Sequence, residues 1–460
     1  MRNTILILGF TLLLLSGGCT MIPKYQRPES PVPRVIPGTE ASTAIPVNEL
    51  TWKEFFVDPG LQAIIELALE NNRDLKIATL NVEKLRSVYR IQRASLFPGL
   101  SSSAGADNYR VPEQMSSSGA YNVAQYSIRG SVSWEIDLFG RIRSLKKKAL
   151  NQFLAMNQTR NAARISLISA VADSYLALAA DLEILELARS TLKIQETSFD
   201  LIRQSRDAGV ASDLTFYQSR SQVEAARLDV ARSTGLVSLD RNSLNLLVGS
   251  IVNDKLLPTN LSAVEESPDV SPGLESIVLL RRPDIQAAEY QLKSMNANIG
   301  AARAAFFPRI SLTAAIGTVA PDLATLFETG TDSWAFTPQI IQPIFAGGSL
   351  FANLKSAKID RDIAVAQYEK AIQTAFREIS DVLAKQKTLS EQLDAQQALV
   401  KSLDESFRLS NARYNEGIDS YLGVLVSQRS LYDAQRGLIG TRQACRSLQI
   451  AMFKVLGGTN

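Results

Sequence analysis

The sequence predicts a mixed α/β membrane protein in which one unit occurs twice, each copy containing two strands and a long helical hairpin. Three observations predict this fold class. The chain resembles itself at a nearly constant offset. Four segments of about ten residues alternate apolar and polar side chains, as transmembrane strands do. Two long stretches carry apolar residues at heptad-like spacing, which indicates coiled-coil packing.

The composition excludes several classes of site. The 460 residues include no histidine and only two cysteines, Cys19 and Cys445. Zinc sites of thiolate and imidazole, and Ser-His-Asp or Cys-His catalysis, are therefore excluded. The 49 basic and 46 acidic residues leave a formal charge of +3, without the clustered basic excess of nucleic-acid-binding proteins. We expect no enzyme activity, no metal, no cofactor and no nucleic-acid partner, and we expect Cys445 to be a small buried side chain.

Residues 1–18 are predicted to be a lipoprotein signal peptide. A short positive region precedes an apolar run over Ile5–Leu15, which is too short to span a bilayer, and small residues lead to Cys19. This order resembles a bacterial lipobox, although Ser16 stands where a branched aliphatic residue is usual. We expect a covalent lipid on Cys19, and the following Thr20 indicates the outer membrane. An ordinary secretory signal cleaved just before the cysteine is the alternative.

Residues 19–58 form a proline-rich leader, which we expect to lie extended along another part of the protein. The duplicated units follow at 59–250 and 274–458, joined by a linker at 251–273. An offset of 210 residues aligns Asp74 with Asp284 and the Phe-Pro pairs that end the first helix of each copy. Further along the copies, the offset becomes 208. Two copies are too few for a solenoid and predict a pseudo-symmetric protomer.

Each copy has the same predicted element order. A helix comes first, at 73–96 and at 283–306, and a proline then prevents its continuation. Two strands and a long antiparallel helical hairpin follow. Glycine relieves the turn at each hairpin tip, and Ser or Asp caps the next helix. The strands are predicted at about 98–108, 124–138, 308–318 and 334–345, and the tips near 207–213 and 415–420.

The strand alternation predicts which side chains contact lipid. Apolar residues of one parity would face lipid and polar residues would face a lumen. A half-buried soluble sheet alternates in the same way and is the alternative. The residues predicted to face lipid are Tyr126, Ile128, Val132, Trp134, Ile136, Trp334 and Phe336.

Four strands per chain are too few for a closed barrel. Lipid tolerates no open sheet edge, and known bacterial barrels begin at about eight strands. Several chains must therefore share one barrel: two would give eight strands and three would give twelve. We expect an oligomeric tube, part β and part α.

The chain resembles the outer membrane factor (TolC-like) family, in its lipoprotein branch that serves RND-type efflux. The resemblance covers essentially the whole chain, because several long motifs occur in order. These motifs are CTMIPKYQRP after the lipobox, NNRDL (71–75), WEIDLFGR (134–141), LLRRPDI (279–285), IGAARAAFFPRISLTA (299–314), PIFAGGSL (343–350) and VLGG (455–458).

The resemblance implies a homotrimer with a 12-strand transmembrane β-barrel in the outer membrane and a 12-helix α-barrel in the periplasm. It implies a passive exit channel for drugs or other small toxic compounds, lipid-anchored in the cell outer membrane. A periplasmic adaptor protein and an inner-membrane RND transporter would be its partners and would open its periplasmic end. Two alternatives remain: a channel for protein secretion, and a periplasmic coiled-coil scaffold lipoprotein that forms no channel.

The hairpin tips are the candidate gate. In the family pattern, Arg413-Tyr414 through Leu422 marks the inner tip, and we hypothesise that three copies of Asp419 help to form the closed constriction. The alternative is that these are solvated charges, worth under about 1 kcal/mol each. The candidate tip residues are Asp419, Arg413, Tyr414, Glu416, Gly417, Asp207, Gly209 and Asp213.

Overall fold

A computed structural model describes residues 20–35, 45–46, 51–268, 270–271 and 276–458. The expected signal peptide and Cys19 lie outside the described residues. The chain divides into two compact units. Unit 1 comprises 1–29, 81–157 and 287–369, and unit 2 comprises 30–80, 158–286 and 370–460.

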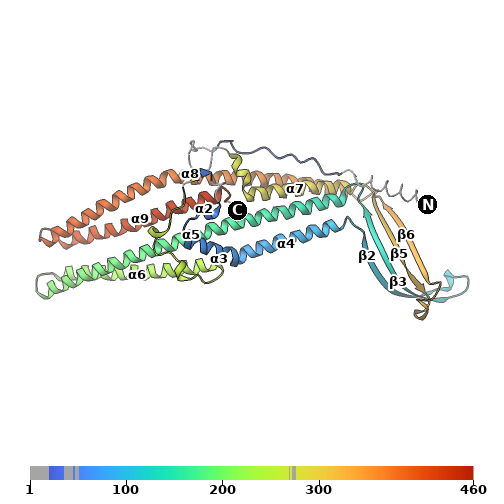
Figure 1. Cartoon of the computed structure of the whole chain (residues 1–460), viewed down its shortest axis with the longest axis horizontal. Coiled ribbons are helices and arrows are strands. Elements are labelled where there is room, and N and C mark those ends of the chain that lie inside the picture. Colours follow the sequence, from blue (N-terminus) through green and yellow to red (C-terminus); the bar gives the residue numbers. More distant parts are fainter. Residues whose placement is uncertain (1–19, 36–44, 47–50, 269, 272–275, 459–460) are drawn as a thin grey trace. The chain divides into compact units, whose positions relative to one another are not determined.

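Unit 1 contains a four-stranded antiparallel sheet with the strand order β2-β3-β5-β6 (Figure 1). The two hairpins β2-β3 and β5-β6 come from the two copies of the repeat, and the β3-β5 pairing joins them. Both hairpin connections include a short 3₁₀ turn. The strands are β2 (Gly99–Val111), β3 (Tyr121–Ile136), β5 (Arg309–Ala320) and β6 (Asp332–Ile341).

The helices before β2 and β5 end two residues earlier than the sequence predicts. Helix α4 (Arg73–Ala94) and helix α7 (Pro283–Ala304) have equal lengths and the same ends relative to their repeats. Each is followed by a tight turn, in which the amide of Phe97 donates to the carbonyl of Ala94 at 2.9 Å in the first copy. The cause is the proline after each phenylalanine, because proline disfavours the helical conformation of the residue before it.

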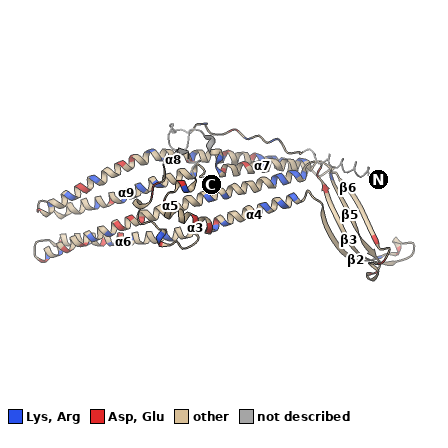
Figure 2. Ribbon diagram, viewed as in Figure 1, with Lys and Arg blue, Asp and Glu red and all other residues tan. Residues whose placement is uncertain are grey.

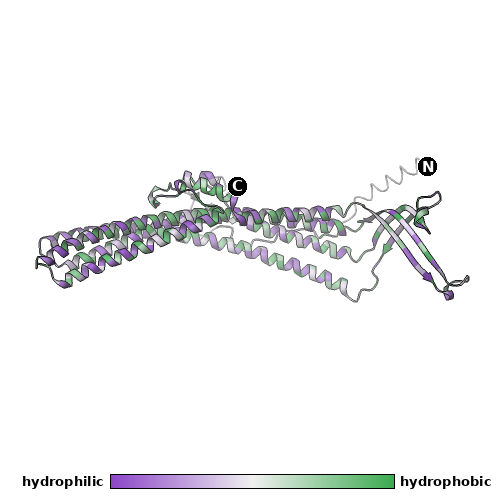
Figure 3. Cartoon of the chain, turned by 90° about the horizontal axis from the view of Figure 1, so that it is seen from below, coloured by the Kyte–Doolittle hydropathy of each residue, from purple (hydrophilic) through white to green (hydrophobic). Residues whose placement is uncertain are grey.

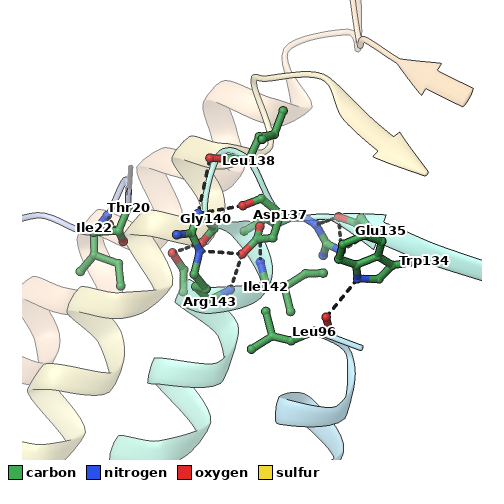
Figure 4. A network of polar contacts seen from close by, with 12 residues as sticks. Thr20, Ile22, Leu96, Trp134, Glu135, Asp137, Leu138, Gly140, Ile142 and Arg143 are labelled. Atoms are coloured by element: carbon green, nitrogen blue, oxygen red, sulfur yellow. Dashed lines mark hydrogen bonds and ion pairs between the residues drawn. The ribbon is translucent and has the colours of Figure 1, made fainter. Parts of the chain in front are cut away.

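Strand β3 also ends earlier than predicted, at Ile136 rather than at residue 138. Asp137 leaves the strand pattern because its carboxylate accepts from the amides of Ile142 and Arg143, at 3.0 and 2.8 Å. It thereby satisfies the free amides at the start of α5 (Arg141–Asp207), as Figure 4 shows.

Strand β6 ends at Ile341, four residues before the predicted end. Pro343 follows closely, and a proline has no amide hydrogen to donate to a neighbouring strand. Ile344 and Phe345, which the sequence placed in the strand, therefore lie beyond it with exposed fractions of 95% and 91%.

The described part of the leader in unit 1 packs along α7. Arg27 and Tyr25 both bond to Glu289, with the Arg27 Nη2 to Glu289 Oε2 distance at 2.8 Å. Asn296 donates to the carbonyl of Pro23 at 2.8 Å. The leader is thus bound to α7 through its side chains and through its backbone.

Unit 2 contains the tips of both long helical hairpins and the parts of the helices next to them (Figure 1). One hairpin is α5 with α6 (Asp213–Val248), and the other is α8 (Ser349–Asn415) with α9 (Tyr421–Val455). Its shorter elements are β1 (Ile45–Pro46), α2 (Trp52–Phe55), α3 (Pro59–Asn71), η4 (Asp254–Leu256), η5 (Leu261–Ala263), β4 (Val270–Ser271) and η6 (Ser276–Arg281).

In unit 2, matched hydrogen bonds join the start of the first helix of each copy to the end of the last helix of the same copy. Asn72 donates to the carbonyl of Leu247 at 2.8 Å, and Arg282 donates to the carbonyl of Val455 at the same distance. These pairs are related by the repeat offsets. Arg282 is 7% exposed and also binds the carboxylate of Glu378 at 2.8 Å.

One described helix, α5, contains an 18-residue window apolar enough to cross a membrane by length and composition. Within the protein, 61% of that window is buried. Such burial is typical of a core helix, and Ile168, Val171 and Leu178 from this region are almost fully enclosed.

Candidate functional site

The strand register brings all seven residues predicted to face lipid onto one side of the sheet. Directly opposed residues in antiparallel strands point to the same side. Val132 pairs with Ala314, and Ala314 pairs with Phe336. The same side of the sheet therefore carries Leu100, Ala104, Tyr126, Ile128, Val132, Trp134, Ile136, Ile310, Leu312, Ala314, Ile316, Trp334, Phe336 and Ile340.

This apolar face is partly uncovered within the chain. Trp334 is 78% exposed and Phe336 is 58% exposed. The opposite face carries mainly small and polar side chains, such as Ser131 and Thr313, and the alternation is visible along the strands in Figure 3. A large exposed apolar surface on a sheet indicates a membrane or protein interface.

The two hairpin tips have the same backbone structure. In the second tip, Gly417 donates to the carbonyl of Tyr414 and Ile418 donates to that of Arg413, both at 2.9 Å. The first tip repeats both bonds at 2.8 Å, 208 residues earlier. Gly209 and Gly417 have φ angles of +79° and +73°, which L side chains rarely adopt. Glycine is therefore required for this helix-ending motif.

The tips differ in their ion pairs. In the second tip, Arg413 Nε lies 2.5 Å from Asp419 Oδ2, and a second bond of 3.2 Å joins the same side chains. The Arg413 guanidinium therefore holds the pKa of the Asp419 carboxyl below its ordinary value. The first tip has Ser205 and Ala211 at these two positions, so this pair is impossible there.

The first tip has a different, local pair. Arg206 binds its neighbour Asp207 at 2.7 Å, and its guanidinium lies 3.9 Å from the centre of the Phe216 ring. Asp213 stands at the first position of α6, where a carboxylate favours the helix dipole. Glu416 is exposed beside the second turn, and its carboxylate makes no hydrogen bond or ion pair with any residue that the structure describes.

A hydrophobic cluster next to the tips was not predicted from the sequence. It contains residues of both hairpins, and Tyr414 contributes to it through its ring, 5.2 Å from that of Tyr421. The repeat-matched pair Phe199 and Phe407 was the available signal, because aromatic residues recur there at the same position. The buried members are Ile202, Phe216, Tyr421, Val424 and Leu425, with Phe199, Phe407 and Tyr414 against them.

Cys445 is half-buried, so the prediction of a buried side chain is wrong. Its thiol lines a cavity of about 250 Å³ beside Leu389 and Leu393, and this partial burial raises the thiol pKa. Among the described residues, no cluster of three or more Cys, Asp or Glu side chains is arranged to hold a metal ion.

Comparison with known proteins identifies the family. The profile described as "outer membrane efflux protein" matches residues 64–250 and 274–458, which together make up most of the chain. The chain belongs to this family. It is 46% identical over 466 aligned residues to the probable efflux pump outer membrane protein TtgC of Pseudomonas putida, covering 100% of this chain and 96% of that protein.

Two solved structures have the same fold. A membrane protein from Pseudomonas aeruginosa matches with a TM-score of 0.90 at 40% identity, over 96% of this chain and 98% of that one. The open state of the outer membrane channel MtrE from Neisseria gonorrhoeae matches with a TM-score of 0.85 at 36% identity, with the same coverage.

Proposed function

We propose that this protein is the outer-membrane exit channel of a tripartite RND-type efflux pump. It conducts drugs or other small toxic compounds passively from the periplasm to the exterior. A periplasmic adaptor and an inner-membrane transporter engage its helical tips and open it. Its relatives are efflux pump outer membrane proteins, and no step of this role requires catalysis.

The observation that carries the proposal is the apolar face of the four-stranded sheet. All four strands contribute to it, and β2 and β6 are its edges among the described strands. An open edge leaves backbone donors and acceptors without partners, and lipid offers none. The sheet therefore has to be completed by further copies of the chain.

A homotrimer fits this requirement. Three copies with four strands each form a 12-strand barrel, and their hairpins supply four helices each to a 12-helix periplasmic tunnel. The resemblance to trimeric channels of the family supports this number. Polar side chains such as Ser131 and Arg129 then face the lumen, while Trp334 and Phe336 contact lipid.

The second hairpin tip is the proposed gate. Its ion pair between Arg413 and Asp419 crosses the turn and has no counterpart in the first tip. Three such tips would meet at the closed end, and dilation would separate them. Because both side chains are about half exposed, water screens the pair and it contributes little to stability.

The proposed lipid on Cys19 would anchor the leader to the inner leaflet of the outer membrane. The leader's direction along α7 supports this, because its bonds progress from Glu289 through Asn296 to Arg303 as the chain runs back toward Met21. Replacement of Cys19 by alanine should abolish palmitate labelling, and retained label would contradict the assignment.

Charge on the apolar face tests the channel proposal. Phe336→Arg puts a guanidinium toward lipid, at a cost of about 2–4 kcal/mol near the bilayer midplane. Thr337→Arg, one residue along β6, puts the same group on the polar face. In cells that lack the native channel, Phe336→Arg should fail to restore efflux of a fluorescent dye, whereas Thr337→Arg should restore it. Equal activity of the two variants would contradict the proposal.

A further inference from the structure

Helix α4 carries three arginines on one face in the turns that lead into β2. Arg86, Arg90 and Arg93 follow the i, i+4, i+7 spacing, which places them in line along the helix. All three are exposed, and none of their guanidinium groups has a hydrogen-bond or ion-pair partner among the residues that the structure describes. Figure 2 shows the basic residues gathered on this part of α4. We call the three residues the arginine stripe.

Helix stability does not account for the whole stripe. A basic residue in the last turn interacts favourably with the helix dipole, which explains Arg93. This effect falls off within one turn, and Arg86 lies about two turns before the helix ends. Three like charges in line also repel one another. The stripe therefore has an unsatisfied preference for anionic groups.

The duplicated fold indicates the direction in which the stripe faces. At the offset of 210, its residues match Asn296, Gly300 and Arg303 of α7. These α7 residues contact the leader: Asn296 and Arg303 donate to its carbonyls, and a Cβ on Gly300 would lie 2.6 Å from the side chain of Ile22. A leader that ends in a membrane lipid has to run outside the tunnel. The matched face of α4 then also points outward.

The stripe lies close to the level at which the sheet enters the membrane. Helix α4 ends at Ala94, and β2 begins at Gly99. Trp134, near the same end of β3, donates to the carbonyl of Leu96 at 3.0 Å. Seven residues of helix span about 10 Å, so the whole stripe is within about one Debye length of the headgroups.

We propose that the arginine stripe binds the headgroup phosphates of anionic phospholipids in the periplasmic leaflet. This inference rests on the proposed outer-membrane channel. One guanidinium group can donate two parallel hydrogen bonds to two oxygens of the same phosphate. Each basic residue near an anionic membrane surface contributes about a fivefold gain in affinity for that surface. In the second copy the leader covers the equivalent face, and in the first copy lipid headgroups do.

Trp134 provides a reporter beside the stripe. The full-length protein carrying Trp334→Phe is reconstituted in phosphatidylcholine vesicles, and bromine on the acyl chains quenches tryptophans in contact with that lipid. Brominated phosphatidylcholine measures insertion of the sheet. Substitution of brominated phosphatidylglycerol at the same mole fraction measures the preference for anionic lipid around Trp134. We expect a preference of at least about fivefold, lost in 1 M salt.

Two triple variants decide the outcome. The stripe variant is Arg86→Gln with Arg90→Gln and Arg93→Gln. The control replaces by glutamine three exposed arginines of unit 2 whose side chains have no partner within the described part of the chain, namely Arg73, Arg220 and Arg232. The stripe variant should lose the preference while keeping its quenching by brominated phosphatidylcholine, and the control should keep both.

A preference that persists in the stripe variant, or that disappears equally in the control, would overturn the inference while leaving the channel proposal intact. Absence of quenching by either brominated lipid in the parent protein would contradict the membrane-inserted sheet itself, and the inference would fail with it.

Discussion

The two copies of the repeat share a backbone and differ at matched side chains. Asn72 and Arg282 donate to equivalent carbonyls, those of Leu247 and Val455, but only Arg282 also binds carboxylates, those of Asp284 and Glu378. The position matched to Glu378 in the first copy is an alanine. The repeated hydrogen bond joins the first and last helices of each copy. In the second copy the charged side chains of Arg282 and Glu378 make this connection stronger.

The same contrast occurs at the tips and along the short helices. The second tip has the Arg413–Asp419 pair, and in α7 the absence of a side chain at Gly300 allows the leader to pack closely there, a position that we call the leader notch. In the first copy these positions hold Ser205, Ala211 and Arg90. The two copies have the same backbone structure, and their different side chains make different contacts in each copy. The differences between the copies therefore indicate function more directly than the similarities do.

The largest effect should come from the buried arginine. Arg282→Met leaves Glu378 without its charged partner and the Val455 carbonyl without its donor, and should lower the free energy of unfolding by about 3 kcal/mol. Asn72→Ala removes two neutral bonds, one to the carbonyl of Leu247 and one from the amide of Leu75 that caps α4, and should cost about 2 kcal/mol. Thermal unfolding of both variants in detergent, followed by circular dichroism, measures the difference. Equal losses of unfolding free energy in the two variants would contradict a stronger connection between the first and last helices in the second copy.

The leader notch should give the next largest effect. A side chain at Gly300 would overlap Ile22 and Ser144, so Gly300→Leu should displace the leader and cost about 2 kcal/mol. The matched variant Arg90→Leu changes an exposed position and should leave the leader in place. Limited trypsin cleavage after Lys24 reports the release. Protection of the leader in Gly300→Leu would argue against its binding along α7.

The tip ion pairs should affect leakage rather than stability. Asp419→Asn should admit a large antibiotic that the intact outer membrane excludes, because it breaks the pair with Arg413. Asp207→Asn in the first tip breaks only a pair between neighbours and should leave exclusion unchanged. Equal leakage through both variants would show that the gate does not depend on the second tip.

Acidity should act on this pair in a defined direction. The pKa of Asp419 is lowered by Arg413, so the pair is present above the ordinary pKa of aspartate and is lost as the pH falls through the lowered value. The tip should therefore stay closed down to about pH 4 and loosen only below it. Leakage that rises between pH 7 and pH 5 would contradict this pair as the closing contact.

The smallest effect should come from a carboxyl pair in the first hairpin. Burial and the neighbouring Asp181 raise the pKa of Asp240 to about 6, and the matched residues in the second hairpin are Leu389 and Leu448. Because the pKa of Asp240 is raised in the folded state, protonation of its carboxyl stabilises that state fully at pH values below the ordinary pKa of aspartate. This stabilisation is lost as the pH rises through about 6. The melting temperature should therefore rise slightly from pH 7 to pH 5, and Asp240→Leu should remove that rise.

Much of the architecture follows from the sequence because its determinants are local. Alternation along Tyr126–Leu138, heptad spacing in the hairpins and the glycines at the tips all act within a few residues. The strand ends were misplaced at Asp137 and Pro343, because capping of a following helix and the loss of an amide override the alternation.

Long-range contacts were not predictable in the same way. The bond from Arg282 to Val455 and the binding of the leader to Glu289 join residues that are far apart in sequence. The aromatic cluster that includes Phe199 and Phe407 also depends on how the hairpins pack. A single sequence gives candidates for such pairs only through the repeat, since matched positions have matched surroundings.

The most direct test of the channel is single-channel current from the purified protein in planar bilayers. We expect discrete conductance steps from an oligomer of three chains, with steps several-fold larger in the double variant Arg413→Gln/Asp419→Asn than in the parent. An oligomer that inserts into the bilayer and gives no steps in either form would contradict the proposed channel.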